Sequence, residues 1–138
     1  MGPRIERLKT RPEFLRVAAT RKKWASPGLI LQVKSHPADG QPARLDGFLR
    51  VGFTVSRKVG NAVARNRAKR RLRALAAEIL PHCDLRVDPQ QNFSGYDLVI
   101  IGRRATLTRP YRKLTDDLLK ALRKMGIAVN TPQQEDAQ

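Results

Sequence analysis

The chain has 138 residues, enough for one domain with a modest hydrophobic core. Its 28 Lys and Arg residues against 12 Asp and Glu give a formal net charge of +16, which indicates a polyanionic partner, nucleic acid before an anionic membrane. The sequence has no apolar run long enough to span a bilayer and no apolar signal segment among its first ten residues, and its one cysteine excludes an internal disulfide. We therefore expect a cytoplasmic protein.

The first third of the chain predicts one helix and two strands. Thr10, Pro12 and Glu13 form a T-x-x-E capping box with a proline in the first turn, so a helix is expected to about Thr20. Residues 29–34 alternate in polarity, as a strand does, and residues 35–46 form a proline-containing loop. Residues 49–56 alternate more cleanly. Their outward side chains are small or polar and leave room for a ligand: Arg50, Gly52, Thr54 and Ser56.

Residues 57–73, RKVGNAVARNRAKRRLR, form the most charged segment of the chain, with eight Arg or Lys and no acid. Gly60 allows a turn into a helix that Asn61 caps. The apolar residues that follow recur at steps of four, four, three and four and define one buried face: Ala64, Ala68, Leu72, Leu75 and Ile79. A merely solvated face would mix charge signs. Unpaired arginines, with their fork of donors for phosphate oxygens, favour a nucleic-acid contact.

The second half of the chain predicts a polar loop over residues 84–95, a strand over 96–102 that is covered on both faces, and a last helix. That helix opens at Thr108 and Pro110 and ends at Gly126. Its apolar stripe is Tyr111, Leu114, Leu118, Leu122 and Met125. We expect a single α/β two-layer sandwich over residues 1–126 and a flexible polar tail over 127–138.

The stretch RVGFTVSRKVGNAVARNRAKRRLR resembles the protein subunit of bacterial ribonuclease P, whose signature Arg-Asn-Arg run falls here at Arg65, Asn66 and Arg67. The opening RLKTRPEFLRV, the buried strand YDLVIIGRRA and the closing helix are also similar to that family, so the resemblance covers about 120 residues in order. It implies the element order αβββαβα, a short strand near residues 23–25, a small mixed sheet and a left-handed crossover through the basic helix, against the usual hand.

The resemblance also implies a function. Ribonuclease P is an endoribonuclease that removes the 5′ leader of precursor tRNA; its RNA subunit is the catalyst and uses Mg²⁺ bound mainly by RNA. The protein would bind the catalytic RNA and the single-stranded leader and strengthen substrate and metal binding, with no small-molecule substrate. The RNA-contacting residues implied by position are Arg57, Lys58, Asn61, Arg65, Asn66, Arg67, Lys69, Arg70 and Arg73. The implied leader cleft contains Phe14, Arg16, Gln32, Arg50 and Thr54.

Three questions stay open at the level of sequence. Phe14 fits either base stacking in a basic cleft or plain core packing, because most phenylalanines on helix faces are buried. Ala18 and Gln32 stand where the family often has aromatics, so stacking would rest on Phe14 and on Trp24 as the other candidate. A protein-only nuclease would need grouped metal ligands, but Asp116 and Asp117 fit a helix start, and the histidines and the one cysteine fit loops, so no protein catalytic residue is expected. A structural RNA-binding protein of the ribosomal type is the remaining alternative.

Overall fold

The computed structural model describes residues 3–37, 48–85 and 93–130. In chain order its elements are β1 (Arg4–Arg7), α1 (Arg11–Ala19), β2 (Lys23–Ala25), β3 (Leu29–Pro37), β4 (Phe48–Val55), α2 (Ala62–Ile79), β5 (Cys83–Asp84), β6 (Phe93–Gly102), α3 (Tyr111–Lys124) and β7 (Ala128–Val129). Short 3₁₀ turns follow β4, α2 and β6, at Arg57–Val59, Leu80–His82 and Arg104–Leu107. None of the described helices is long and apolar enough to cross a membrane.

Five strands form one mixed sheet in the order β1-β4-β6-β3-β2. β4 is parallel to both β1 and β6, whereas β3 is antiparallel to β6 and to β2. The basic helix α2 therefore connects two adjacent parallel strands, β4 and β6. The α/β architecture and the strand near residues 23–25 are confirmed, and the left hand of this crossover stays a prediction.

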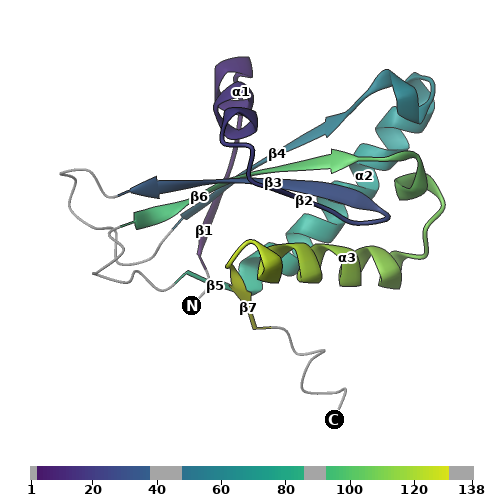
Figure 1. The fold of residues 1–138 in the computed structure, drawn as a ribbon. Helices are drawn as coiled ribbons and strands as arrows, with labels where there is room; N and C mark the ends of the chain where they lie inside the picture. Colours follow the sequence, from purple (N-terminus) through teal and green to yellow (C-terminus); the bar gives the residue numbers. More distant parts are fainter. Residues whose placement is uncertain (1–2, 38–47, 86–92, 131–138) are drawn as a thin grey trace, which may run out of the picture.

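The helices divide between the two faces of the sheet, with α2 and α3 on one side and α1 on the other (Figure 1). The main core lies on the α2 and α3 side, where Leu31, Leu49 and Ile100 of the sheet pack with Leu72 and Leu118 of the helices. A second, small cluster lies under α1 and consists of Leu8, Val17 and Val99, with Phe14 and Ile101 packed against it. The predicted two layers thus describe the main core, while α1 covers only part of the opposite face.

Several boundaries differ from the sequence predictions. β1 was not predicted; it pairs along the edge of β4. β3 continues through Pro37, beyond the expected loop start at residue 35, and β6 begins at Phe93 inside the expected loop. Ile127 and Val129 are buried, and β7 pairs with β5, so the chain packs with the domain past Gly126. The predictions for residues 38–47, 86–92 and the tail 131–138 lie outside the described residues.

Candidate nucleic-acid interface

Helix α2 forms as its sequence predicts. The Asn61 side-chain oxygen accepts a hydrogen bond from the backbone N–H of Ala64 at 2.9 Å, which satisfies one of the free donors of the first turn. Gly60 adopts φ +153°, in the region that favours glycine, and an added Cβ there would lie 2.9 Å from the Ala64 Cβ. Ala68, Leu72 and other apolar residues of the stripe are buried against the sheet, so the opposite side of the helix faces outward.

The outward side of α2 is a cationic face, which we define as the exposed or half-buried residues Arg65, Asn66, Arg67, Lys69, Arg70 and Arg73. Within the described part of the chain, none of its Arg or Lys residues forms a salt bridge. Arg65 donates to the backbone oxygen of Gly60 at 3.0 Å and so also supports the turn before the helix. Like charges this close repel one another, which favours binding of an external polyanion.

Arg71 has a different role from its neighbours on the helix. Its guanidinium donates to the backbone oxygens of Thr106, at 2.6 Å, and Arg109, at 2.7 Å, and so ties α2 to the turn before α3. Position in the family pattern had left Arg71 out of the RNA-contacting set, and this geometry gives a structural reason for its charge. Arg57 and Lys58 are exposed on the 3₁₀ turn that buried Val59 anchors beside α2.

The face of the sheet under α1 carries the predicted cleft residues. Strand register places Gln32, Val99 and Gly52 side by side across β3, β6 and β4. The ring of Phe14 lies directly on Gly52: an added Cβ at residue 52 would be 2.4 Å from the Phe14 Cε1 atom. Phe14 is half-buried and packs against the small cluster. The structure thus shows the packing role that the sequence left open for Phe14, while stacking on a base stays a prediction.

Arg50, which was predicted as a basic rim of the cleft, is held by two carboxylates. Its guanidinium donates to both oxygens of Asp97, at 2.7 and 2.8 Å, and to Glu13 at 3.0 Å. Hydrogen bonding to Asp97 is the main reason why the pKa of Arg50 is raised. Burial by itself would raise the pKa of Asp97, but hydrogen bonds from His36 and Arg50 outweigh it and lower that pKa. The accessible candidates on this face are therefore exposed Thr54 and half-buried Gln32, while Arg16 is exposed on α1.

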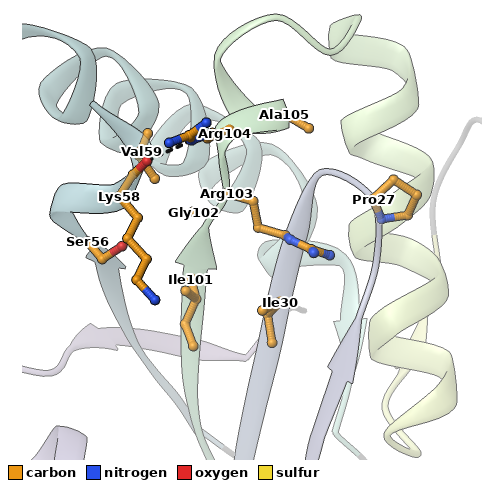
Figure 2. A pocket seen from close by; sticks show the side chains of 10 residues that line it. All are labelled: Pro27, Ile30, Ser56, Lys58, Val59, Ile101, Gly102, Arg103, Arg104 and Ala105. Carbon is orange, nitrogen blue, oxygen red and sulfur yellow. Dashed lines mark hydrogen bonds between the residues drawn. The ribbon is translucent and has the colours of Figure 1, made fainter. Parts of the chain in front are cut away.

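An open groove of about 670 Å³ continues this face beyond α1. Ile30 and Ile101, which are register partners on β3 and β6, project side by side from its floor (Figure 2). Ile101 also packs against the cluster under α1, so the floor is continuous with the Phe14 site. Lys58, Arg103 and Arg104 supply positive charge around the groove. Arg103 and Arg104 were missed in the sequence predictions, although two arginines directly after a buried strand could have identified them.

Trp24 does not belong to this face, which corrects its standing as a second stacking candidate. It pairs in register with fully buried Leu31 and packs against the main core on the α2 and α3 side. The Lys124 ammonium lies 5.6 Å from the centre of its ring, on that same side. A side chain on the opposite face of the sheet from α1 cannot stack on a base beside Phe14.

Contacts or burial within the fold account for three residues that were considered for a protein nuclease: Asp117, His36 and Cys83. Asp117 is buried, accepts two hydrogen bonds from Arg109 and one from the backbone of Gly28, and lies two turns into α3, so the helix-start explanation is wrong for it. His36 lies on β3 and contacts Asp97 at 2.8 Å, so its loop assignment is also wrong. Cys83 is buried on β5, and burial raises the pKa of its thiol to about 12. The described residues contain no group of three or more His, Cys, Asp or Glu that could hold a metal ion.

An unpaired cationic helix face beside an open, groove-bearing sheet face defines an α/β nucleic-acid-binding protein. The family model described as Ribonuclease P matches residues 2–126, so the chain belongs to the ribonuclease P protein family. The ribonuclease P protein component of Paramagnetospirillum magneticum is 52% identical over 132 residues, covering 95% of this chain and 90% of that protein. The corresponding component of Gluconacetobacter diazotrophicus is 45% identical, covering 92% of this chain and 97% of that protein.

Solved structures agree in fold. A mutant RNase P protein of Staphylococcus aureus superposes with a TM-score of 0.64 at 22% identity, covering 88% of this chain and 89% of that one. The RNase P protein of Thermotoga maritima gives 0.60 at 23% identity, covering 83% and 93%. Family membership assigns the chain the role of the protein subunit of ribonuclease P, in partnership with its RNA subunit and in tRNA processing. A structural protein of the ribosomal type is not favoured.

Proposed function

We propose that the two basic surfaces of the protein bind different RNAs: the cationic face of α2 meets the catalytic RNA subunit, and the α1 side of the sheet holds the single-stranded 5′ leader of precursor tRNA. One observation carries the second half of this proposal. The half-buried ring of Phe14 lies on the same sheet face as an open groove with an apolar floor and cationic surroundings. Aromatic rings with flanking cations are the means by which proteins bind single strands without reading their sequence.

The cationic face suits the backbone of a folded RNA better than a single base-specific contact. Its side chains lie on successive turns of one helix and, within the described residues, have no carboxylate partners. If six to eight phosphates are neutralised, the logarithm of the binding constant should fall against the logarithm of salt concentration with a slope of roughly −4 to −7. A slope shallower than about −2 would mean that α2 does not meet the phosphate backbone.

The chemistry of cleavage belongs, in this proposal, to the RNA subunit and to Mg²⁺ held mainly by RNA. The described residues offer no group of acidic, histidine and cysteine side chains suited to a metal ion. The protein would act by binding the leader and by screening the charge that accumulates where two RNAs meet. A single cysteine in the whole chain, buried at Cys83, fits our proposal of a cytoplasmic location, since thiols stay reduced there.

The test is binding and cleavage by the reconstituted holoenzyme at low Mg²⁺, with precursor tRNA and mature tRNA as the two ligands. Stacking on an aromatic ring is worth about 1–3 kcal/mol per base, so Phe14→Ala should weaken precursor binding roughly five- to a hundredfold. Mature tRNA, which has no leader, should bind as before. Leu15→Ala is the matched control, because Leu15 is the next residue of α1 and is 53% exposed, away from the cluster.

Three outcomes would refute the proposal. They are equal binding of precursor and mature tRNA by the holoenzyme, no stimulation of cleavage by the protein, and an equal loss of binding of both ligands in Phe14→Ala. The last result would make Phe14 a packing residue only.

A further inference from the structure

Helix α1 has a weak apolar attachment to the sheet. Val17 is its only fully buried residue, and the cluster that it joins contains two other buried side chains, Leu8 and Val99. Half-buried Phe14 packs against the same cluster. Two polar contacts add to this: the Thr20 hydroxyl donates to the backbone oxygen of Val33 at 3.0 Å, and Glu13 pairs with Arg50. So small a cluster leaves the position of α1 strongly dependent on these polar contacts.

Glu13 uses its two carboxylate oxygens for two different purposes. Oε1 accepts hydrogen bonds from the backbone N–H groups of Lys9 and Thr10, at 2.9 and 2.8 Å, and from the Thr10 hydroxyl, and so closes the start of α1. Oε2 accepts from Arg50 at 3.0 Å. The backbone hydrogen bonds to Oε1, chiefly the one from Lys9, lower the pKa of Glu13, so the carboxylate is charged at neutral pH. The first turn of α1 is thereby bonded to the sheet through one ionised side chain.

Arg50 is itself held in place by residues of two other strands, β6 and β3. Asp97, which is 2% exposed, is its register partner on β6 and receives two of its N–H groups. His36 on β3 bonds the same carboxylate. A bidentate guanidinium–carboxylate pair in a half-buried site holds the side chain in one geometry. The Nη1 group of Arg50, which donates to Glu13, therefore has a defined position above β4, and Phe14 follows Glu13 directly on α1.

We propose that Arg50 is a positioning residue: pinned by Asp97, it fastens Glu13 and thereby holds Phe14 over Gly52, where the ring meets the leader. Arg50 then contributes to leader binding without touching a phosphate. This inference rests on the proposed leader site. It replaces the direct contact expected for Arg50 from the sequence, and it extends the site to Glu13 and Asp97, two acidic residues that no charge argument would place in an RNA-binding surface.

The variant Glu13→Gln distinguishes a positioning role of Arg50 from a direct phosphate contact, because the two roles predict different changes in RNA binding. If Arg50 met a phosphate, removal of the neighbouring negative charge would leave RNA binding unchanged or strengthen it. If Arg50 positions α1, the loss of one charge-assisted hydrogen bond should weaken precursor binding by roughly tenfold and leave mature tRNA binding unchanged. Asp116→Asn is the matched control, because it removes one negative charge from an exposed position on α3.

A second variant, Arg50→Met with Asp97→Asn, removes both charges and leaves no carboxylate buried without its guanidinium. It should lose the same leader-dependent affinity as Glu13→Gln, the two changes should not add, and the salt slope should match the wild type. A slope shallower by about 0.7 would reveal a lost phosphate contact to single-stranded RNA and overturn the inference. So would unchanged or tighter precursor binding by Glu13→Gln. The proposed function fails separately, if the wild-type protein shows no preference for precursor.

Discussion

The variant Gly52→Ala tests most directly whether precursor tRNA binding requires the Phe14 ring in its observed position. The new Cβ would lie 2.4 and 2.5 Å from the Cε1 and Cζ atoms of Phe14 and 3.2 Å from the Leu8 Cβ, so the ring must move. The closest contacts are to the far end of one side chain, on the face away from the main core. Overpacking costs about 1–3 kcal/mol, and replacing glycine where the backbone permits returns about 0.4–1 kcal/mol. We expect a net loss of about 0.5–2 kcal/mol.

Displacement of the ring should weaken precursor tRNA binding more than it lowers the stability of the fold. Thermal unfolding should show a drop of a few degrees, whereas precursor tRNA should lose most of the affinity that Phe14→Ala removes, about five- to a hundredfold. In the Phe14→Ala background the same substitution should cost no affinity, because the ring that it displaces is gone, and only the small loss of stability caused by the Leu8 contact should remain. The reasoning is refuted if Gly52→Ala leaves precursor binding intact, or if the loss of affinity persists without the ring.

Three further predictions concern charges whose roles the structure distinguishes. Arg67→Ala should flatten the salt slope for RNA binding by about 0.7–0.9 without changing the melting temperature, while Arg71→Ala, which removes two hydrogen bonds to carbonyl oxygens, should cost about 1–3 kcal/mol in a thermal unfolding assay. Asp117→Asn should cost about 2–4 kcal/mol in chemical denaturation, against less than about 0.5 kcal/mol for exposed Asp116→Asn. Because the pKa of Asp97 is lowered in the folded state, its ionised carboxylate stabilises the fold. This stabilisation is complete above the pKa of the unfolded carboxyl, about 4, and is lost as pH falls through the lower pKa of the folded state. Acid unfolding should therefore be steeper in the wild type than in Asp97→Asn.

Elements whose signals are local could be read from the sequence. The Asn61 cap and the spacing of Ala68, Leu72 and Ile79 act within one helix, and the structure buries that stripe as predicted. The alternation of β4 was equally informative, because Leu49 and Val51 must face the core if the strand has one buried face. These features depend on neighbours within a few residues in the chain, so no knowledge of distant contacts was needed.

Features created by distant partners could not be read in this way. The segment Arg4–Arg7 has no clear alternation and becomes a strand because the edge of β4 supplies its hydrogen bonds. The hydrogen bond from Arg50 to Glu13, which joins α1 to the sheet, spans thirty-seven residues, so no local pattern reveals it. Trp24 was misplaced for the same reason: its face is set by pairing with Leu31, and a three-residue strand gives too short a pattern to show it.

The arginines show why composition predicts the class of partner but not the contact residues. Arg50 and Arg71 each donate twice to acceptors far along the chain, Arg50 to Asp97 and Arg71 to the backbone oxygens of Thr106 and Arg109. A sequence pattern weighs these side chains equally with the arginines on the outer side of α2. Only the fold separates them, because an arginine whose donors are satisfied internally gains little from a phosphate and loses its own partners on binding it. We therefore expect the surface available to RNA to be smaller than the net charge suggests. We expect it on α2 and around the groove, where the described acceptors leave the Arg67, Arg70 and Lys58 side chains unpaired.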